Sequence, residues 1–139
     1  QPINNQLPEI SIVLVWLGFG SPTAQAYAHF TQEHWQDSGC ATRAAQAIQT
    51  GELNFLRENM QNAFYDVVFC HDLRYKRLKE QMINLNLVQP SLSGSGSTMF
   101  SLARDQQQAR AACRELERNY PVVAVARMDS RGVRVLPGR

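Results

Sequence analysis

The sequence predicts an α+β fold in which helices pack on one face of a mostly antiparallel sheet. Three observations support this prediction. Predicted strands and helices are interspersed without regular alternation, the chain ends in a strand–helix–strand unit that matches half of a split βαβ arrangement, and no internal repeat or interdomain linker is present. With 139 residues, 44% of them hydrophobic, the chain has the size and composition of one domain with one core. We therefore expect a single domain over residues 1–139.

The chain begins with a predicted strand followed by a helix. Residues 10–16 are β-branched and almost continuously hydrophobic, which predicts a buried strand that ends at Gly18. Ser21 and Pro22 predict the start of a helix, because serine is a favoured N-cap and proline costs nothing at the first helical position. Thr23 is a competing N-cap for the same helix.

Three further helices are predicted in the middle of the chain. The first covers residues 41–48 and ends at Gly51, where glycine readily adopts the left-handed cap conformation. The second covers residues 53–68, where apolar residues recur every three or four positions. The third is capped by Asp72 and extends to Leu85. The apolar face of the second helix consists of Leu53, Leu56, Met60, Ala63, Phe64, Val67 and Val68.

The last third of the chain changes to strand periodicity. A strand–turn–strand element is centred on residues 94–97 and continues as an alternating strand over residues 98–102. Asp105 and Gln108 resemble a capping box, which predicts one more amphipathic helix. A final strand is expected at residues 122–126, and the valines at positions 133 and 135 either extend it or add a short edge strand. The apolar face of the helix consists of Ala109, Ala112, Cys113 and Leu116.

Composition argues against several classes of function. A net charge of +2 is too weak to indicate binding to nucleic acid or to an anionic membrane surface. The basic residues are scattered, except for a cluster at positions 74–79 that we interpret as the solvated face of a helix rather than a phosphate-binding patch. The longest apolar run, residues 10–19, is shorter than the ~20 residues of a membrane helix and lacks the flanks of a signal peptide.

Cysteines and histidines do not show the spacing of a metal or nucleophile site. The cysteines are Cys40, Cys70 and Cys113, and their wide spacing fits reduced thiols in a cytosol better than a disulfide framework. Cys70 and His71 are adjacent, but no second Cys or His lies at ligand spacing, so we interpret Cys70 as a core residue. His29 and His34 lack a third ligand in step with them and are interpreted as surface residues.

The stretch best suited to carry chemistry is the Gly/Ser run before the strand at residues 98–102. Its two glycines allow a ligand to approach the backbone closely, and successive N–H groups in such a run can form a nest that holds a phosphate. On composition alone, a flexible turn is the simpler interpretation. The candidate phosphate-binding residues are Ser93, Gly94, Ser95, Gly96, Ser97 and Thr98.

The order of residues in this run favours phosphate binding, because residues 92–102 resemble the third conserved motif of the GHMP kinases. The version Ser-Gly-Ser-Gly-Ser-Thr-x-Phe is most similar to an isoprenoid-pathway member of that family. Residues 20–24 resemble the Thr-containing helix start of the family's C-terminal lobe. Residues 44–53 and Asn62 are similar to its Asn-containing segment, although the usual Asp after that Asn is Ala63 here. The resemblance spans nearly the full chain, and the glycine-rich turn is its specific part.

The resemblance implies the fold and role of a GHMP kinase C-terminal lobe, with residues 93–98 near the transferring phosphate and Thr23 near the substrate. It implies ATP-dependent phosphorylation of a small-molecule alcohol, with ATP and Mg²⁺ as cofactors of the complete kinase. In that family the N-terminal lobe carries the main phosphate loop and the Lys and Asp residues that activate the acceptor, and we find no such loop in this sequence. We therefore expect the chain to be inactive alone, assign no catalytic or metal-binding residue in it, and expect a cytoplasmic location in a bacterium or in a plastid stroma.

Two alternatives stay open. In the first, the chain is a stand-alone module that binds a nucleotide or another anion. In the second, it is an interaction domain whose sheet or aromatic residues pair with a partner chain, including a second copy of itself. Core packing is the simpler interpretation of those aromatic residues. They are Phe55, Phe64, Tyr65 and Phe69.

Overall fold

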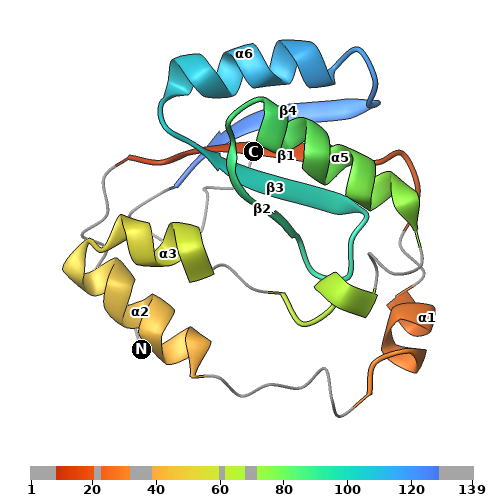
Figure 1. The fold of residues 1–139 in the computed structure, drawn as a ribbon, viewed down its shortest axis with the longest axis horizontal. Coiled ribbons are helices and arrows are strands. Elements are labelled where there is room, and N and C mark those ends of the chain that lie inside the picture. The colour runs from red at the N-terminus through yellow and green to blue at the C-terminus, as the bar shows by residue number, and fades with distance from the viewer. Residues whose placement is uncertain (1–8, 21–22, 32–38, 60–61, 68–71, 129–139) are drawn as a thin grey trace, which may run out of the picture.

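The computed structural model describes residues 9–20, 23–31, 39–59, 62–67 and 72–128. It confirms the predicted α+β class, with a four-stranded antiparallel sheet in the order β2-β3-β1-β4 (Figure 1). The strands are β1 (Ser11–Trp16), β2 (Val88–Leu92), β3 (Thr98–Ala103) and β4 (Val122–Arg127). β3 lies between β1 and β2, and β1 lies between β3 and β4. The strands of the first unit, β1 and β2, are separated by β3, and the strands of the second unit, β3 and β4, are separated by β1. This order confirms the predicted split βαβ arrangement.

Strand β1 lies in the centre of the sheet and explains the continuous hydrophobic run near the start of the chain. Val13 pairs with Ser101 on β3 and with Val125 on β4, and Val15 pairs with Met99 in the same way. Val13 and Val15 are fully buried because they point to the face of the sheet that the helices cover. Burial of such side chains, at about 1.5–3 kcal/mol each, anchors the centre of the fold.

Helices α5 (Leu73–Asn84) and α6 (Gln106–Leu116) cover that face of the sheet (Figure 1). The predicted capping residues start both of them, since Asp72 accepts a hydrogen bond from the Arg74 N–H and Asp105 accepts one from the Gln108 N–H. The Gln108 side chain in turn accepts from the N–H of Arg104, one residue before the cap. The buried residues of the two helices are Tyr75, Leu78, Met82, Ala109, Ala112, Cys113 and Leu116.

The remaining helices lie beside the sheet. Among the described residues, these include α1 (Thr23–Ala28), α2 (Cys40–Thr50) and α3 (Leu53–Asn59), and residues 65–67 are also helical. Gly51 ends α2 in the left-handed conformation, with φ of 76°, as predicted. In Figure 1, α2 and α3 lie together below the sheet, and α1 lies near the end of the glycine-rich turn.

The prediction of one long helix over residues 53–68 is wrong. Helix α3 ends at Asn59, and the chain is not helical at Asn62. The reason is that the Asn62 side chain accepts a hydrogen bond from the Phe64 N–H, at 2.8 Å, and so competes with the helical pattern of the backbone. Phe64 packs against Tyr27 and Phe30, with ring centroids at 4.9 and 5.2 Å, rather than along a continuous helix face.

Several further predictions concern the surface or the chain ends. Arg74, Lys76 and Arg77 are exposed on α5, which agrees with a solvated helix face. Within the described ranges, no helix is long and apolar enough to cross a membrane. The predictions for Ser21, Pro22, His34, Phe69, Cys70, His71 and residues 133–135 lie outside the described residues.

Candidate functional site

The glycine-rich turn connects β2 to β3 and is closed by two backbone hydrogen bonds. The Ser93 N–H donates to the Thr98 carbonyl at 2.9 Å, and the Gly96 N–H donates to the Ser93 carbonyl at 3.1 Å. Gly94 and Gly96 have φ values of +60° and +90°, in the region that side chains other than glycine rarely adopt. The shape of the turn therefore explains why both positions are glycine.

The two glycines differ in their surroundings. A Cβ atom added to Gly96 would lie 2.5 Å from the Tyr75 hydroxyl oxygen and 3.2 Å from two ring carbons of Tyr75. A Cβ atom added to Gly94 would meet nothing within 4 Å. The turn is consequently held against α5 at Gly96 and open at Gly94.

Asn62 fixes the other side of the turn. Its Nδ2 donates to the carbonyl oxygens of Leu92 and Gly94, at 2.9 Å in both cases. The Ser93 carbonyl between them accepts the hydrogen bond that closes the turn. By contrast, the main-chain N–H groups of Gly94 and Ser97 donate to no acceptor within the described part of the chain. The carbonyl groups of residues 92–94 thus accept hydrogen bonds, whereas the N–H groups of Gly94 and Ser97 donate none there. The turn therefore has more donors than acceptors left for a ligand, as an anion requires.

The hydroxyl groups of the site have two different roles. Thr23 Oγ1, at the start of α1, lies 3.1 Å from Ser95 Oγ, so the fold brings together two candidate residues that are 72 positions apart. Ser97 is only 3% exposed, and its hydroxyl donates to the Phe19 carbonyl. Ser97 therefore anchors the turn through its side chain.

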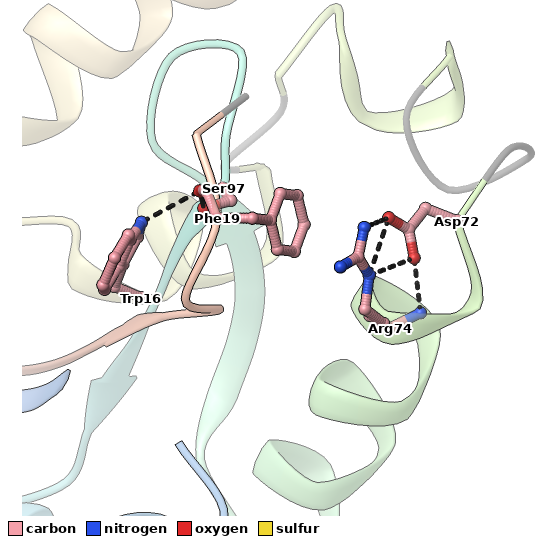
Figure 2. A network of polar contacts seen from close by, with 5 residues as sticks. All are labelled: Trp16, Phe19, Asp72, Arg74 and Ser97. Carbon is pink, nitrogen blue, oxygen red and sulfur yellow. Dashed lines mark hydrogen bonds and ion pairs between the residues drawn. The ribbon is translucent and has the colours of Figure 1, made fainter. Parts of the chain in front are cut away.

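A small network holds the segment between β1 and α1 against the turn, as Figure 2 shows. The Phe19 carbonyl accepts a second hydrogen bond from Trp16 Nε1, at 3.1 Å. The guanidinium carbon of Arg74 lies 3.6 Å from the centroid of the Phe19 ring. The Arg74 side chain also hydrogen-bonds to the Asp72 carboxylate and so lowers the pKa of that carboxyl group. These residues connect the N-terminus of α5 to the turn.

The sequence did not single out Asn62 or Arg74 as members of the site. Asn62 resembles part of a family segment, but its hydrogen-bond partners Leu92 and Gly94 lie 30 and 32 positions further along the chain. No local pattern reveals contacts at that distance. Arg74 belongs to the basic cluster that the sequence predicts on a helix face, and it is exposed there. An asparagine inside an otherwise helical repeat was the one available signal, because its side chain often competes with the helix.

Metal and thiol chemistry find little support at the described residues. No three His, Cys, Asp or Glu side chains there lie close enough together to hold a metal ion. Cys113 is buried on α6, and burial raises the pKa of its thiol. A thiol in that state is a poor nucleophile.

Comparison with known sequences agrees with the resemblance of the turn. The family model described as GHMP kinases C terminal matches residues 44–122. The chain is 27% identical over 120 residues to the 4-diphosphocytidyl-2-C-methyl-D-erythritol kinase of Clostridium acetobutylicum, covering 84% of this chain and 41% of the relative. It is 29% identical over 112 residues to the kinase of the same name from Chloroherpeton thalassium, covering 80% of this chain and 39% of the relative. The chain thus spans less than half the length of these relatives.

Solved structures show the same fold. A crystal structure of 4-(cytidine 5'-diphospho)-2C-methyl-D-erythritol kinase matches with a TM-score of 0.72 and 22% identity, over 87% of this chain and 43% of that one. A crystal structure of L. major mevalonate kinase in complex with R-mevalonate matches with a TM-score of 0.72 and 20% identity, over 96% of this chain and 46% of that one. Because the family match covers more than half of the residues, the chain belongs to the GHMP kinase C-terminal family.

Proposed function

We propose that residues 1–139 form the C-terminal lobe of an ATP-dependent kinase that phosphorylates 4-diphosphocytidyl-2-C-methyl-D-erythritol, and that the glycine-rich turn binds phosphate in this lobe. The shared name of the relatives from C. acetobutylicum and Chloroherpeton thalassium supports this choice of substrate. The N-terminal lobe, which binds most of the ATP in this family, lies outside residues 1–139. The proposal therefore assigns this chain a part of the active site rather than the whole.

One observation carries the phosphate-binding role. In the turn, the carbonyl groups of residues 92–94 are engaged by donors of the protein, while the N–H groups of Gly94 and Ser97 are left without an acceptor in the described chain. A phosphate oxygen that accepts such an N–H gains a charge-assisted hydrogen bond, worth about 1.5–3 kcal/mol. The hydroxyls of Thr23 and Ser95, at 3.1 Å from each other, add donors beside the same turn.

The turn supplies only part of what phosphoryl transfer requires. Transfer needs in-line positioning of the acceptor and neutralisation of the charge on the phosphates, and Mg²⁺ bound to ATP supplies much of that neutralisation. Among the described residues, no three His, Cys, Asp or Glu side chains form a group that could hold a metal ion, so we assign no Mg²⁺ ligand to them. Residues 93–98 contribute uncharged donors to the phosphates, and Thr23 contributes a hydroxyl on the substrate side.

Calorimetry on the purified chain tests this assignment. We expect weak binding of Mg-ATP and of inorganic pyrophosphate, with dissociation constants on the order of 1 mM, because about 4 kcal/mol is what two or three charge-assisted hydrogen bonds provide. Adenosine, which lacks phosphates, is the matched control and should not bind. A coupled kinase assay on the chain alone should show no turnover. Equal binding of adenosine and Mg-ATP, or no binding of either phosphate ligand at about 10 mM, which is about ten times the expected dissociation constant, would contradict the proposal.

An interaction domain is the second candidate, and one observation favours it. Trp16 and Val122 are paired neighbours on β1 and β4, and they are 38% and 50% exposed on the face of the sheet opposite α5 and α6. Exposed apolar neighbours of this kind often mark a contact with another protein or domain. Sedimentation distinguishes the interaction domain from the kinase lobe, since the mass of a self-associating domain increases with concentration. The measurement covers a hundredfold range, from roughly micromolar to tenths of a millimolar, which is the usual range for weak contacts.

A further inference from the structure

We propose that Arg74 is a positioning residue for the glycine-rich turn: held by Asp72, it fixes Phe19, whose carbonyl group holds Ser97 in place. The inference rests on the proposed function, because it concerns the readiness of the same turn to bind phosphate. It adds a residue that lies outside the turn and outside the resemblance described above. Figure 2 shows the residues involved.

The first step is the forked pair at the start of α5. Arg74 Nε lies 3.0 Å from both carboxylate oxygens of Asp72, and Nη2 lies 2.6 Å from Oδ2. The same carboxylate accepts from the Arg74 N–H at 2.9 Å, so both the backbone and the side chain of Arg74 are tied to one group. A fork of this kind fixes the plane of the guanidinium, which a lysine ammonium cannot reproduce. Since the Arg74 side chain is 56% exposed, the pair contributes little to stability by itself, and its effect is mainly geometric.

The second step is the contact of the fixed guanidinium with Phe19. The guanidinium carbon lies 3.6 Å from the centroid of the Phe19 ring, within the range of a cation–π contact. The ring of Tyr75 meets the same phenyl ring in a T-shaped contact, with centroids 5.8 Å apart. Phe19 is thus held by two consecutive residues of α5. This matters because Phe19 lies in the connection after β1, where no ladder of backbone hydrogen bonds restrains it.

The third step is the transfer of this restraint to the turn. The Phe19 carbonyl accepts hydrogen bonds from Trp16 Nε1 and from the Ser97 hydroxyl, which uses both of its lone pairs. Ser97 is 3% exposed, so it is packed into the fold at this point of the turn. A shift of Phe19 therefore moves the acceptor that orients Ser97. On the other side, the Tyr75 hydroxyl packs against Gly96, so both supports of this half of the turn start from the same end of α5.

The test compares matched variants of the full chain by NMR and calorimetry. Trp16 is one of only two tryptophans in the chain, so its indole N–H resonance reports directly on the Phe19 carbonyl without any ligand. We expect Arg74→Met to move this resonance and the amide resonances of Gly96 and Ser97. We expect it to weaken pyrophosphate binding about fivefold, which corresponds to about 1 kcal/mol, the scale of the lost contact. Arg110→Met on α6, another exposed arginine, is the control and should change neither property.

Two further variants separate positioning from charge and from folding. Arg74→Lys keeps the charge but loses the fork, so positioning predicts that it behaves like Arg74→Met, whereas a purely electrostatic role predicts wild-type binding. Asp72→Asn keeps a good N-cap for α5 but removes the ion pair, and it should shift the same three resonances while the helix stays folded.

The outcomes distinguish this inference from the proposed function. Unchanged Trp16 and Ser97 resonances in Arg74→Met, or wild-type affinity in Arg74→Lys, would overturn the positioning role. If the wild-type chain does not bind pyrophosphate, the proposed function fails, and the indole resonance alone still decides whether Arg74 positions the turn.

Discussion

The two glycines of the turn should differ strongly in their tolerance of alanine. Both have positive φ, so either substitution places a side chain in the left-handed region, at a cost of about 1–2 kcal/mol. At Gly94 nothing lies near the new Cβ, and that cost is the whole effect. At Gly96 the new Cβ would lie 2.5 Å from the Tyr75 hydroxyl, which adds about 1–3 kcal/mol of overpacking. We expect Gly96→Ala to lose about 2–5 kcal/mol and Gly94→Ala about 1–2 kcal/mol.

Urea unfolding of the two variants, followed by circular dichroism, measures this difference. The slope of the free energy of unfolding with urea should stay constant, because neither substitution changes the surface exposed on unfolding. A second-site change adds a sharper control: Tyr75→Phe removes the hydroxyl oxygen but leaves ring carbons at 3.2 Å from the new Cβ. In the Gly96→Ala background it should therefore recover only part of the loss.

Equal losses of stability in the two alanine variants would refute this expectation. Equal losses would mean that the backbone conformation alone explains both glycines and that the contact with α5 has no energetic weight. Full recovery by Tyr75→Phe would also contradict it, since the remaining ring contacts are tighter than ordinary van der Waals distances.

Three further predictions follow from other contacts. Asn62→Ala should lower the free energy of unfolding by about 2–3 kcal/mol, because three hydrogen bonds of its side chain are lost. Urea unfolding measures this loss, with the Asn59→Ala variant as the comparison. The pKa values of Asp72 and Asp105 are lowered in the fold, Asp72 mainly by the Arg74 side chain and Asp105 mainly by the Gln108 N–H. The two ionised carboxylates therefore stabilise the fold above the unfolded pKa near 3.8, and this stabilisation is lost as the pH falls through the lowered folded pKa values. Below pH 4, the urea midpoint should therefore decrease less in the Asp72→Asn/Asp105→Asn double variant than in the wild type. Cys113 should react slowly with a thiol reagent at pH 8 (roughly half a unit below a free thiol's pKa) until urea unfolds the chain, as peptide mass mapping would show, and fast reaction of the folded chain would contradict its burial.

Local patterns predicted the elements whose signals are local. The caps at Asp72 and Asp105, the apolar face of α6, and the glycine at the end of α2 all act within a few residues, and the structure confirms each of them. The hydrophobic run of β1 likewise predicted a buried strand. The Gly/Ser run was predicted to be a turn before β3, and its glycines do adopt positive φ.

Long-range contacts explain what the sequence could not predict. Asn62 ends the predicted helix through its local bond with the Phe64 N–H, but its other partners are the turn carbonyls, 30 and 32 positions away, which a helical repeat cannot reveal. In the sequence Phe19 is only the end of an apolar run, yet its carbonyl and ring connect the turn to α5. The proximity of Thr23 to Ser95 depends on how α1 docks at the turn, which only the folded chain determines.

Mapping of the ligand site by NMR tests the central claim most directly. The measurement is a titration of the ¹⁵N-labelled chain with Mg-ATP, following every backbone amide. We expect the largest shifts at the amides of Gly94 and Ser97, with smaller shifts at Thr23 and Ser95. Shifts spread over other surfaces, or none at concentrations where calorimetry detects binding, would contradict phosphate binding by the glycine-rich turn.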